Sequence, residues 1–437
     1  MENCIEYNSR RRFTSAALAS VLAVLSASAS GPALATDIED VISAPVRERA
    51  FTVHPRTYYF DRKLPGSQEK EAWAGGGWLG YDSGWFSDLL RGGLIGYTSQ
   101  PIWAPDDKDG TLLLAPGQQG YSVLGQAYGA LKLWEQTFTG YRQGVDQPEV
   151  NPQDNRMTPN TFEGYTLAGK VLGVDYFGGY LDKMKTRNAD FFTNFATVAG
   201  APPGVKEAMW LGGLSFSPNK DITLHLSNYH VPNILTSTYA DASWLATLTD
   251  EYKLRLGGQY MYQSSTGDDL LTGSSFHTWS GGAKADLIRG PATFTVAYTQ
   301  TGRGAAYQAP YGFWAGYTSM IVEDFDQAGE RAWLIGGTFD FVKLKVPGLV
   351  INAAAVFGRD SINSATGLGI ANTDEYDLTI DYRFKSGNWP EWLKPLWIRG
   401  RAVHIDQTLG GFTNVTKDYR IIVNYEWVFK WTKYPWE

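Results

Sequence analysis

Two arginines near the start of this sequence are spaced so that their side chains could act together. Arg56 and Arg62 lie six residues apart in an alternating segment, so both belong to the same face of a strand. A guanidinium offers a carboxylate two parallel hydrogen bonds together with charge, and these contacts replace water that an anion loses in a narrow passage. Basic residues along such a face could therefore bind and release small anions in succession.

The same parity rule assigns other basic residues to the polar faces of their segments. They are Lys132, Arg255, Arg383, Arg399, Arg401 and Arg420. A structural interpretation competes with this one, because Asp377, Asp381 and Glu426 fall on the same faces and could simply pair with these arginines. In a polar segment, Glu323, Asp324 and Asp326 could form an acidic counter-face at a constriction or belong to a solvated loop.

The elements that would carry these residues are strands. Apolar and polar residues alternate in residues 252–262, 293–300, 376–384 and 419–429, and each of these segments has one apolar face. Eight short breaks occur near residues 86–90, 134–136, 170–173, 217–220, 248–251, 288–291, 346–348 and 386–395. Long polar segments separate the strand pairs that these breaks join. With a first and a last strand, the pattern predicts an all-β fold: a transmembrane antiparallel β-barrel of eighteen strands, with short periplasmic turns and long extracellular loops.

The composition favours a barrel over other classes. Aromatic residues make up 14% of the chain, yet the mean hydropathy is only -0.27 and no uninterrupted apolar run of membrane-helix length follows the N-terminal region. A soluble sandwich of this sequence would expose two aromatic bands to water. The net charge of -7 and the absence of a basic stripe argue against a nucleic-acid partner. The single cysteine, Cys4, lies in the expected export signal, which excludes disulfides and thiol catalysis in the mature chain.

The N-terminal region is typical of an exported protein. Three arginines, Arg10 to Arg12, precede an apolar run from Phe13 to Leu25 and an "ALA" site that ends at Ala35. We expect a cleaved signal peptide at residues 1–35, and the sequence leaves the general and the twin-arginine export routes open. A periplasmic segment is expected at 36–50, the barrel at 51–431 with an inward-folded loop at 144–160, and a C-terminal tail at 432–437.

Three segments resemble one known family. "DNRMTPNTFEG" at Asp154 to Gly164, "RTYYFDR" at Arg56 to Arg62 and "KDYRIIVNYEW" at Lys417 to Trp427 are similar to motifs of the OprD-type porins, the outer-membrane carboxylate channels. The resemblance implies that loop 144–160 narrows the pore and that Arg56, Arg62, Arg156 and Arg187 belong to a basic ladder along one side of the lumen. The chain departs from the family by continuing past Trp431 through "TKYPWE".

The expected function is a porin for passive, substrate-preferring diffusion of small carboxylates or similar nutrients into the periplasm. A channel for sugars or chitooligosaccharides is the alternative that the family leaves open, and a barrel hydrolase is a remote one. We expect no catalytic residue, metal or cofactor. The expected partners are small anionic or neutral solutes, outer-membrane lipid, lipopolysaccharide and the barrel-assembly machinery, and the protein is expected to be a monomer or a loose homotrimer. A further alternative is a structural barrel whose lumen is plugged by residues 302–329.

Overall fold

The strands form a closed antiparallel barrel in the computed structural model, which describes residues 49–431. The expected signal peptide and C-terminal tail lie outside the described residues. The first half of the barrel contains β1 (Arg49–Lys63), β2 (Lys70–Asp82), β3 (Leu90–Trp103), β4 (Tyr121–Leu133), β5 (Gln136–Gln143), β6 (Thr161–Val171), β7 (Val174–Lys185), β9 (Met209–Asn219) and β10 (Ile222–Val231). The second half contains β11 (Leu235–Thr247), β12 (Tyr252–Ser265), β13 (His277–Arg289), β14 (Ala292–Thr301), β15 (Arg331–Asp340), β16 (Leu349–Arg359), β17 (Asn372–Arg383), β18 (Leu396–Leu409), β19 (Phe412–Tyr425) and β20 (Trp427–Trp431).

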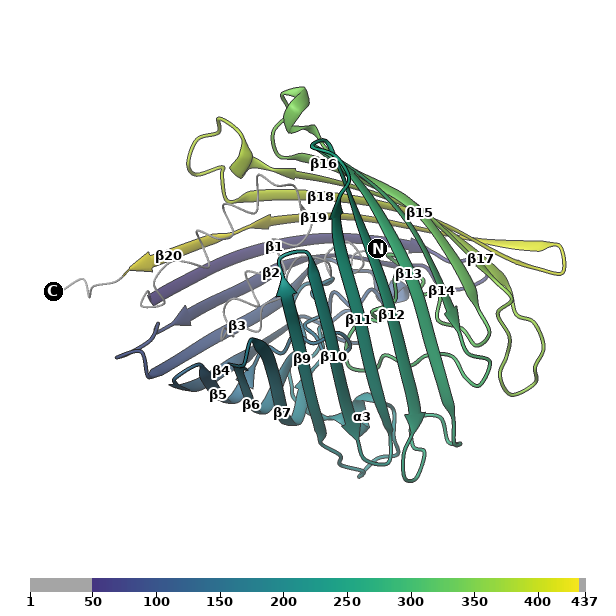
Figure 1. The fold of residues 1–437 in the computed structure, drawn as a ribbon, viewed down its shortest axis with the longest axis horizontal. Coiled ribbons are helices and arrows are strands. Elements are labelled where there is room, and N and C mark those ends of the chain that lie inside the picture. Colours follow the sequence, from purple (N-terminus) through teal and green to yellow (C-terminus); the bar gives the residue numbers. More distant parts are fainter. Residues whose placement is uncertain (1–48, 432–437) are drawn as a thin grey trace.

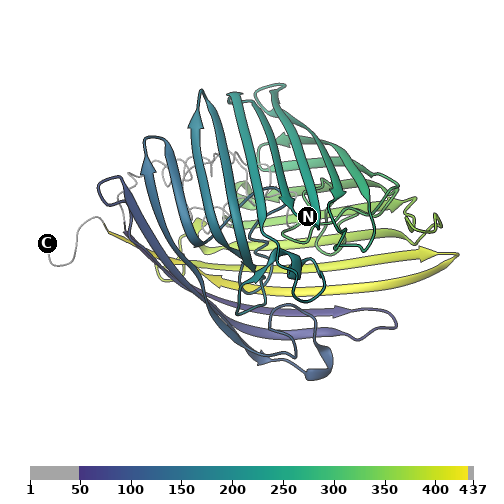
Figure 2. The same ribbon diagram turned by 90° about the horizontal axis from the view of Figure 1, so that it is seen from below.

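The eighteen-strand prediction is confirmed, because β19 and β20 are two parts of one last strand. Both pair with β1 and close the barrel, and the interruption between them falls at Glu426. Figures 1 and 2 show β1 beside β19 and β20 in a wall that curves round to meet itself. Arg49 and Ala50, which the sequence assigned to the preceding segment, already belong to β1 and pair with β20 and β2.

Short and long connections alternate around the barrel. All eight predicted short breaks join consecutive strands at the end of the barrel where β1 begins and β20 ends. The opposite, long-loop end carries residues 104–120, 144–160, 186–208, 302–330 and 360–371. These connections contain η2 (Asp106–Lys108), the two-residue β8 (Thr193–Asn194) and α3 (Phe195–Val198), while η3 (Phe341–Leu344) and η4 (Phe384–Ser386) lie in short-turn connections. Within the described residues, no helix is long and apolar enough to cross a membrane.

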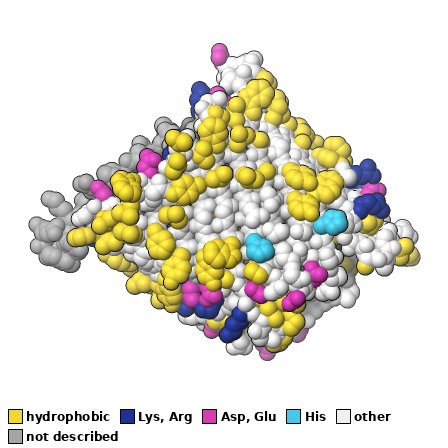
Figure 3. Space-filling model, turned by 60° about the horizontal axis from the view of Figure 1, so that its bottom comes forward, with side chains coloured by type: hydrophobic (Ala, Val, Ile, Leu, Met, Phe, Trp, Pro, Cys, Tyr) yellow, Lys and Arg dark blue, Asp and Glu magenta, His cyan; other side chains and the backbone are white. Residues whose placement is uncertain are grey.

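The burial pattern is that of a barrel whose apolar side chains face outward, as they would toward lipid. On β17, Tyr376, Leu378 and Ile380 are exposed, whereas Glu375 and Asp377 on the opposite face are buried. Figure 3 shows hydrophobic side chains spread over one outer face, with charged side chains gathered toward its rims. Alternation therefore gives each strand an apolar outer face and a polar inner face, which suits a barrel in a bilayer.

A glycine-rich stretch of β2 has a packing role. Gly77 has a φ of 120°, and a Cβ at this position would lie 1.8 Å from the carbonyl oxygen of His54. Only glycine allows β2 to pass β1 this closely beside Pro55. The "GGGWLG" sequence at Gly75 to Gly80 thus belongs to a strand contact.

The largest apolar cluster lies inside the barrel toward the long-loop end. It joins Phe162 of β6 and Leu211 of β9 to Phe195 of α3 and Tyr311 of segment 302–330. The Phe195 and Tyr311 rings meet edge to face at 5.1 Å, and the Tyr311 hydroxyl donates to the Phe195 carbonyl at 3.2 Å. Loop 186–208 and the part of segment 302–330 around Tyr311 are therefore packed against the inner wall at β6 to β10, on the other side of the barrel from β17 to β1.

Candidate functional site: an arginine wall and two internal loops

Six of the predicted basic residues lie together on four neighbouring strands. We call this set the arginine wall: Arg56 and Arg62 on β1, Arg383 on β17, Arg399 and Arg401 on β18, and Arg420 on β19. Arg420 is the register partner of Arg401 on one side and of Phe60 on the other. Strand alternation turns all six toward the lumen, because they share parity with the buried residues of their strands.

Carboxylates of neighbouring or the same strands hold three members of this wall in place. Arg420 donates two hydrogen bonds to Asp418, at 2.7 and 3.2 Å, and Arg62 donates a third to the same carboxylate at 2.7 Å. Arg399 is bidentate on Asp381, at 2.6 and 3.0 Å. The structural interpretation of these arginines therefore holds in part, although Asp381 pairs with Arg399 on the next strand.

Aromatic rings of the same wall have cations over their faces. The guanidinium carbons of Arg62, Arg156 and Arg420 lie 5.3, 5.2 and 5.0 Å from the centre of the Phe60 ring. Trp397 has Arg383 and Arg399 at 4.4 and 4.6 Å. Such cation–π contacts stabilise and orient the guanidinium groups. These ring faces are consequently in contact with charged groups of the protein itself.

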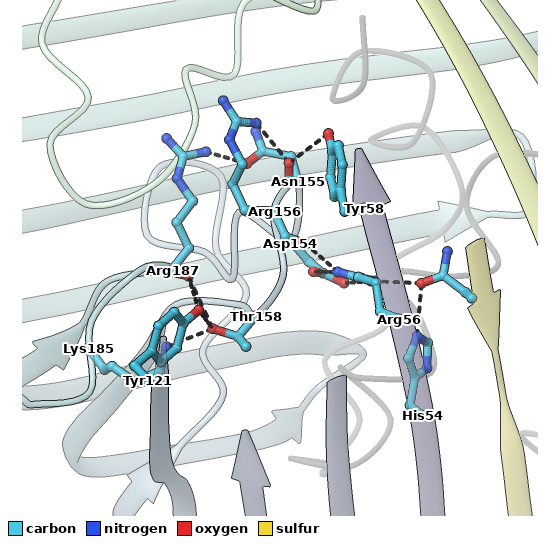
Figure 4. A network of polar contacts seen from close by, with 11 residues as sticks. His54, Arg56, Tyr58, Tyr121, Asp154, Asn155, Arg156, Thr158, Lys185 and Arg187 are labelled. Atoms are coloured by element: carbon cyan, nitrogen blue, oxygen red, sulfur yellow. Dashed lines mark hydrogen bonds and ion pairs between the residues drawn. The ribbon is translucent and has the colours of Figure 1, made fainter. Parts of the chain in front are cut away.

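Arg56 fastens loop 144–160 to the wall (Figure 4). Its guanidinium is bidentate on Asp154, at 2.6 and 3.1 Å, and also donates to the carbonyl oxygen of Arg156 at 2.6 Å. The remaining donor, Nε, reaches Asn424 on β19 at 2.7 Å. One buried arginine thus connects the first strand, the last strand and the loop.

The same loop is held at further points by Arg156 of its own motif and by two cations that follow the motif. Arg156 donates to the carbonyl oxygen of Thr111 at 2.8 Å, and Arg187 donates to the side chain of Asn155. Lys185, which sequence reasoning did not select, donates to Thr158 at 3.2 Å and is fully buried. Its burial depends on β7 packing against the loop, and no periodicity of the sequence indicates that contact.

The far end of loop 144–160 reaches the opposite side of the barrel. Glu149 accepts hydrogen bonds from Ser237 on β11 at 3.0 Å and from Tyr307 of segment 302–330 at 2.5 Å. Burial raises the pKa of Glu149 to about 7, against the opposing effect of these two hydrogen bonds. Since Asp154 is bound at β1 and Glu149 at β11, the loop crosses the lumen.

Segment 302–330 brings its acidic residues toward the arginine wall. Glu375 of β17 accepts hydrogen bonds from the backbone N–H groups of Val322 and Glu323, at 2.9 and 2.7 Å, and Asp377 accepts one from Ile321 at 3.0 Å. These contacts place the start of the acidic run beside the wall.

The three predicted acids of this segment share one electrostatic environment. Burial raises the pKa of Glu323, Asp324 raises it further, and the charge of Arg62 lowers it. Burial also raises the pKa of Asp324, on which Arg187 acts in the opposite direction, and raises that of Asp326 well above its usual range. Glu323 and Asp324 therefore lie within electrostatic reach of two predicted cations, Arg62 and Arg187, whereas the neighbours that act on Asp326 are other acids.

Two predicted cations lie apart from the wall. Lys132 is at the short-turn end of β4, 5.7 Å from the centre of the Trp85 ring. Arg255 is on β12, 3.7 Å from Asp286 of β13. Both face inward, as parity required, but neither belongs to the group around Phe60.

Arg62 offers an arrangement suited to an anion. Asp418 binds its Nε, while Nη1 and Nη2 donate no hydrogen bond within residues 49–431. The side chain is 16% exposed, whereas that of Arg420 beside it is fully buried. A guanidinium held through Nε can still receive a carboxylate end-on through its two terminal amino groups.

An eighteen-stranded barrel with internal loops and an inward row of arginines has the form of an outer-membrane channel. The sequence model described as "outer membrane porin, OprD family" matches residues 46–429, and the chain therefore belongs to the OprD family. The resemblance drawn from the three motifs is confirmed. The protein is an integral outer-membrane β-barrel porin, and proteins of this family are passive channels rather than enzymes.

Solved structures share the fold at low sequence identity. Pseudomonas aeruginosa OccK9 (OpdG) has a TM-score of 0.78 at 21% identity, over 88% of this chain and 99% of that one. P. aeruginosa OpdK with vanillate has a TM-score of 0.75 at 19% identity, over 87% and 99%. A BenF-like porin from Pseudomonas fluorescens Pf-5 has a TM-score of 0.76 at 17% identity, over 87% and 99%. Among curated proteins, no sequence matches this chain.

Proposed function

We propose that this porin prefers small carboxylates and lets them diffuse passively across the outer membrane into the periplasm. The observation that carries the proposal is Arg62, whose two terminal amino groups are available within the described residues and face the lumen beside further cations. An anion that leaves water at the constriction would regain charge and two parallel hydrogen bonds there.

The environment of the aromatic rings favours this proposal over the sugar channel. Carbohydrates would need open ring faces along the path, and the faces of Phe60 and Trp397 are occupied by guanidinium groups. The structure of OpdK, a protein of similar fold, contains vanillate, which is an aromatic carboxylate. Both points support an anionic solute.

The test is a permeation panel with the purified protein. We expect proteoliposomes to take up benzoate and vanillate faster than a neutral disaccharide, and we expect planar bilayers to show stepwise conductance with carboxylate-dependent block. Protein-free liposomes give the background. Equal rates for anionic and neutral solutes of matched size would contradict the carboxylate preference, and faster uptake of oligosaccharides would favour the sugar channel.

A further inference from the structure

A second group of lumenal cations lies on the neighbouring strands β12 and β13, away from the arginine wall. Arg255, Gly257 and Gln259 follow one another on the inward face of β12. Lys284 is the register partner of Gly257, and Asp286 is the partner of Arg255. Two cations and an amide therefore surround a position that has no side chain.

Among residues 49–431, the two cations are held by charge and donate no hydrogen bond. Lys284 Nζ and Arg255 Nη1 each lie 3.7 Å from the same oxygen of Asp286, beyond hydrogen-bond distance. The other oxygen of Asp286 accepts a hydrogen bond from Thr295 at 2.8 Å. One carboxylate thus faces two cations. The three side chains together keep a net positive charge, and the two cations keep available N–H groups.

Gln259 adds an independent indication of a ligand. It is 6% exposed, yet neither Oε1 nor Nε2 has a hydrogen-bond partner among the residues that the structure describes. Its register partner is Gly282, a second inward position without a side chain. A buried amide with no partner is costly, and a polar group of a solute would satisfy it.

Tyr317 of segment 302–330 closes one side of this space. Lys284 Nζ lies 5.2 Å from the centre of its ring. A Cβ at Gly257 would lie 2.8 Å from the Tyr317 hydroxyl oxygen, so glycine is what allows the tyrosine to approach β12. Tyr317, the two cations and the Gln259 amide therefore lie close together on the inner face of β12 and β13.

We propose that Arg255, Lys284 and Gln259 form a second anion subsite, which takes a carboxylate bearing a hydroxyl group on the neighbouring carbon. The cations bind the carboxylate, and the Gln259 amide donates to and accepts from the hydroxyl, which is itself both donor and acceptor. A solute that leaves the arginine wall thereby meets another site of the same chemistry on a different side of the lumen. This inference rests on the proposed carboxylate preference.

The experiment compares lactate with propanoate, which differ by that hydroxyl. In planar bilayers, the concentration dependence of current block gives an apparent affinity for each anion. We expect Gln259→Leu to reduce the affinity for lactate by about fivefold and to leave that for propanoate unchanged, since one neutral hydrogen-bonding group is lost. We expect Lys284→Met to weaken the block by both anions. Lys253→Met is the control, because it removes an exposed cation near the end of the same strand.

The outcomes separate this subsite from the proposed function. If Gln259→Leu changes both anions equally, or Lys284→Met changes neither, the subsite is wrong even where the wild-type channel prefers carboxylates. If the wild-type channel itself does not distinguish carboxylates from neutral solutes, the proposed function fails. In Lys284→Met alone, Asp286 keeps its charge but loses one of its two cations. The double variant Lys284→Met with Asp286→Asn removes that charge as well, and it must give the same loss of block if the single variant inserts poorly.

Discussion

Asp418 lies between Arg62 and Arg420 and accepts hydrogen bonds from both. It binds Arg420 through two nitrogens but Arg62 only through Nε, so the two arginines have different chemical roles. Arg420 is fully buried and also donates to the carbonyl oxygen of Ile321, which fits a role in holding segment 302–330. Arg62 keeps its two terminal amino groups, Nη1 and Nη2, available toward the lumen. A sequence pattern assigns both to the inward face and cannot distinguish them, because the difference depends on how Asp418 of β19 contacts each guanidinium.

At the scale of this residue, we expect Arg62→Ala to lower the apparent affinity for benzoate roughly tenfold, the effect of losing a charge-assisted hydrogen-bonding group. Arg62→Lys keeps the charge and loses the two-nitrogen geometry, so its affinity should lie between those of wild type and Arg62→Ala. The measurement is block of single-channel current at low salt. The difference should shrink at high ionic strength, since charges in a solvated pore are screened over about 10 Å at 0.1 M.

Arg289→Ala is the matched control for the loss of one positive charge. This arginine ends β13 at the short-turn end, with a side chain that is 61% exposed and paired with Glu251. We expect it to leave benzoate block unchanged. A similar loss in Arg62→Ala and Arg289→Ala would mean that only the overall charge of the protein matters.

The strands were predictable because each obeys a local rule. Alternation marks their faces, and the eight short breaks mark their pairing, so the barrel and the inward direction of the basic residues follow from the sequence. The internal loops follow no such rule. Arg56 and Asp154 are 98 residues apart and Glu149 and Tyr307 are 158 apart, and pairings over these distances leave no period in the sequence. The interruption at Glu426 and the short elements β8 and α3 were not predicted for the same reason.

At the scale of the loops, the contact of Glu149 with Tyr307 and Ser237 should depend on pH. Burial raises the pKa of Glu149 from 4.5 to about 7. The protonated form therefore stabilises the loop contact fully below about pH 4.5, and this contribution, on the order of 3 kcal/mol, is lost as the pH rises through about 7. We expect current fluctuations of the open channel to increase between pH 6 and pH 8, and Glu149→Gln to remove that increase.

Glu330 provides the control for this pH dependence. It ends segment 302–330, which carries Tyr307, and burial raises the pKa of Glu330 to about 7 as well. Glu330→Gln should leave the increase in fluctuations intact if Glu149 is the responsible group. The assignment to Glu149 is wrong if Glu149→Gln retains the wild-type pH profile and Glu330→Gln abolishes it.

At the scale of the whole barrel, Arg56 connects the first strand to the last. We expect Arg56→Ala to lower the free energy of unfolding by about 3–5 kcal/mol, because Asp154 keeps a buried charge without its cation. Adding Asp154→Ala should restore part of the loss. Urea unfolding in lipid vesicles, followed by tryptophan fluorescence, measures both variants. Equal losses in the single and double variants would show that the ion pair itself is not what Arg56 contributes.

The seam between β1 and β19 also sets an order of events in folding. His54 and Arg56 both contact Asn424, which lies about 370 residues away in the chain, and such distant contacts close late because the chain must first lose the entropy of a very long loop. Until then, β1 and β19 are unprotected edges. Arg56 reaches Asp154 from the position that Asn424 helps to fix, so loop 144–160 acquires its final anchor in the same step that seals the barrel. A nascent barrel with an open seam thus also lacks this anchor, and loop 144–160 takes its final place across the lumen only when the cylinder is complete.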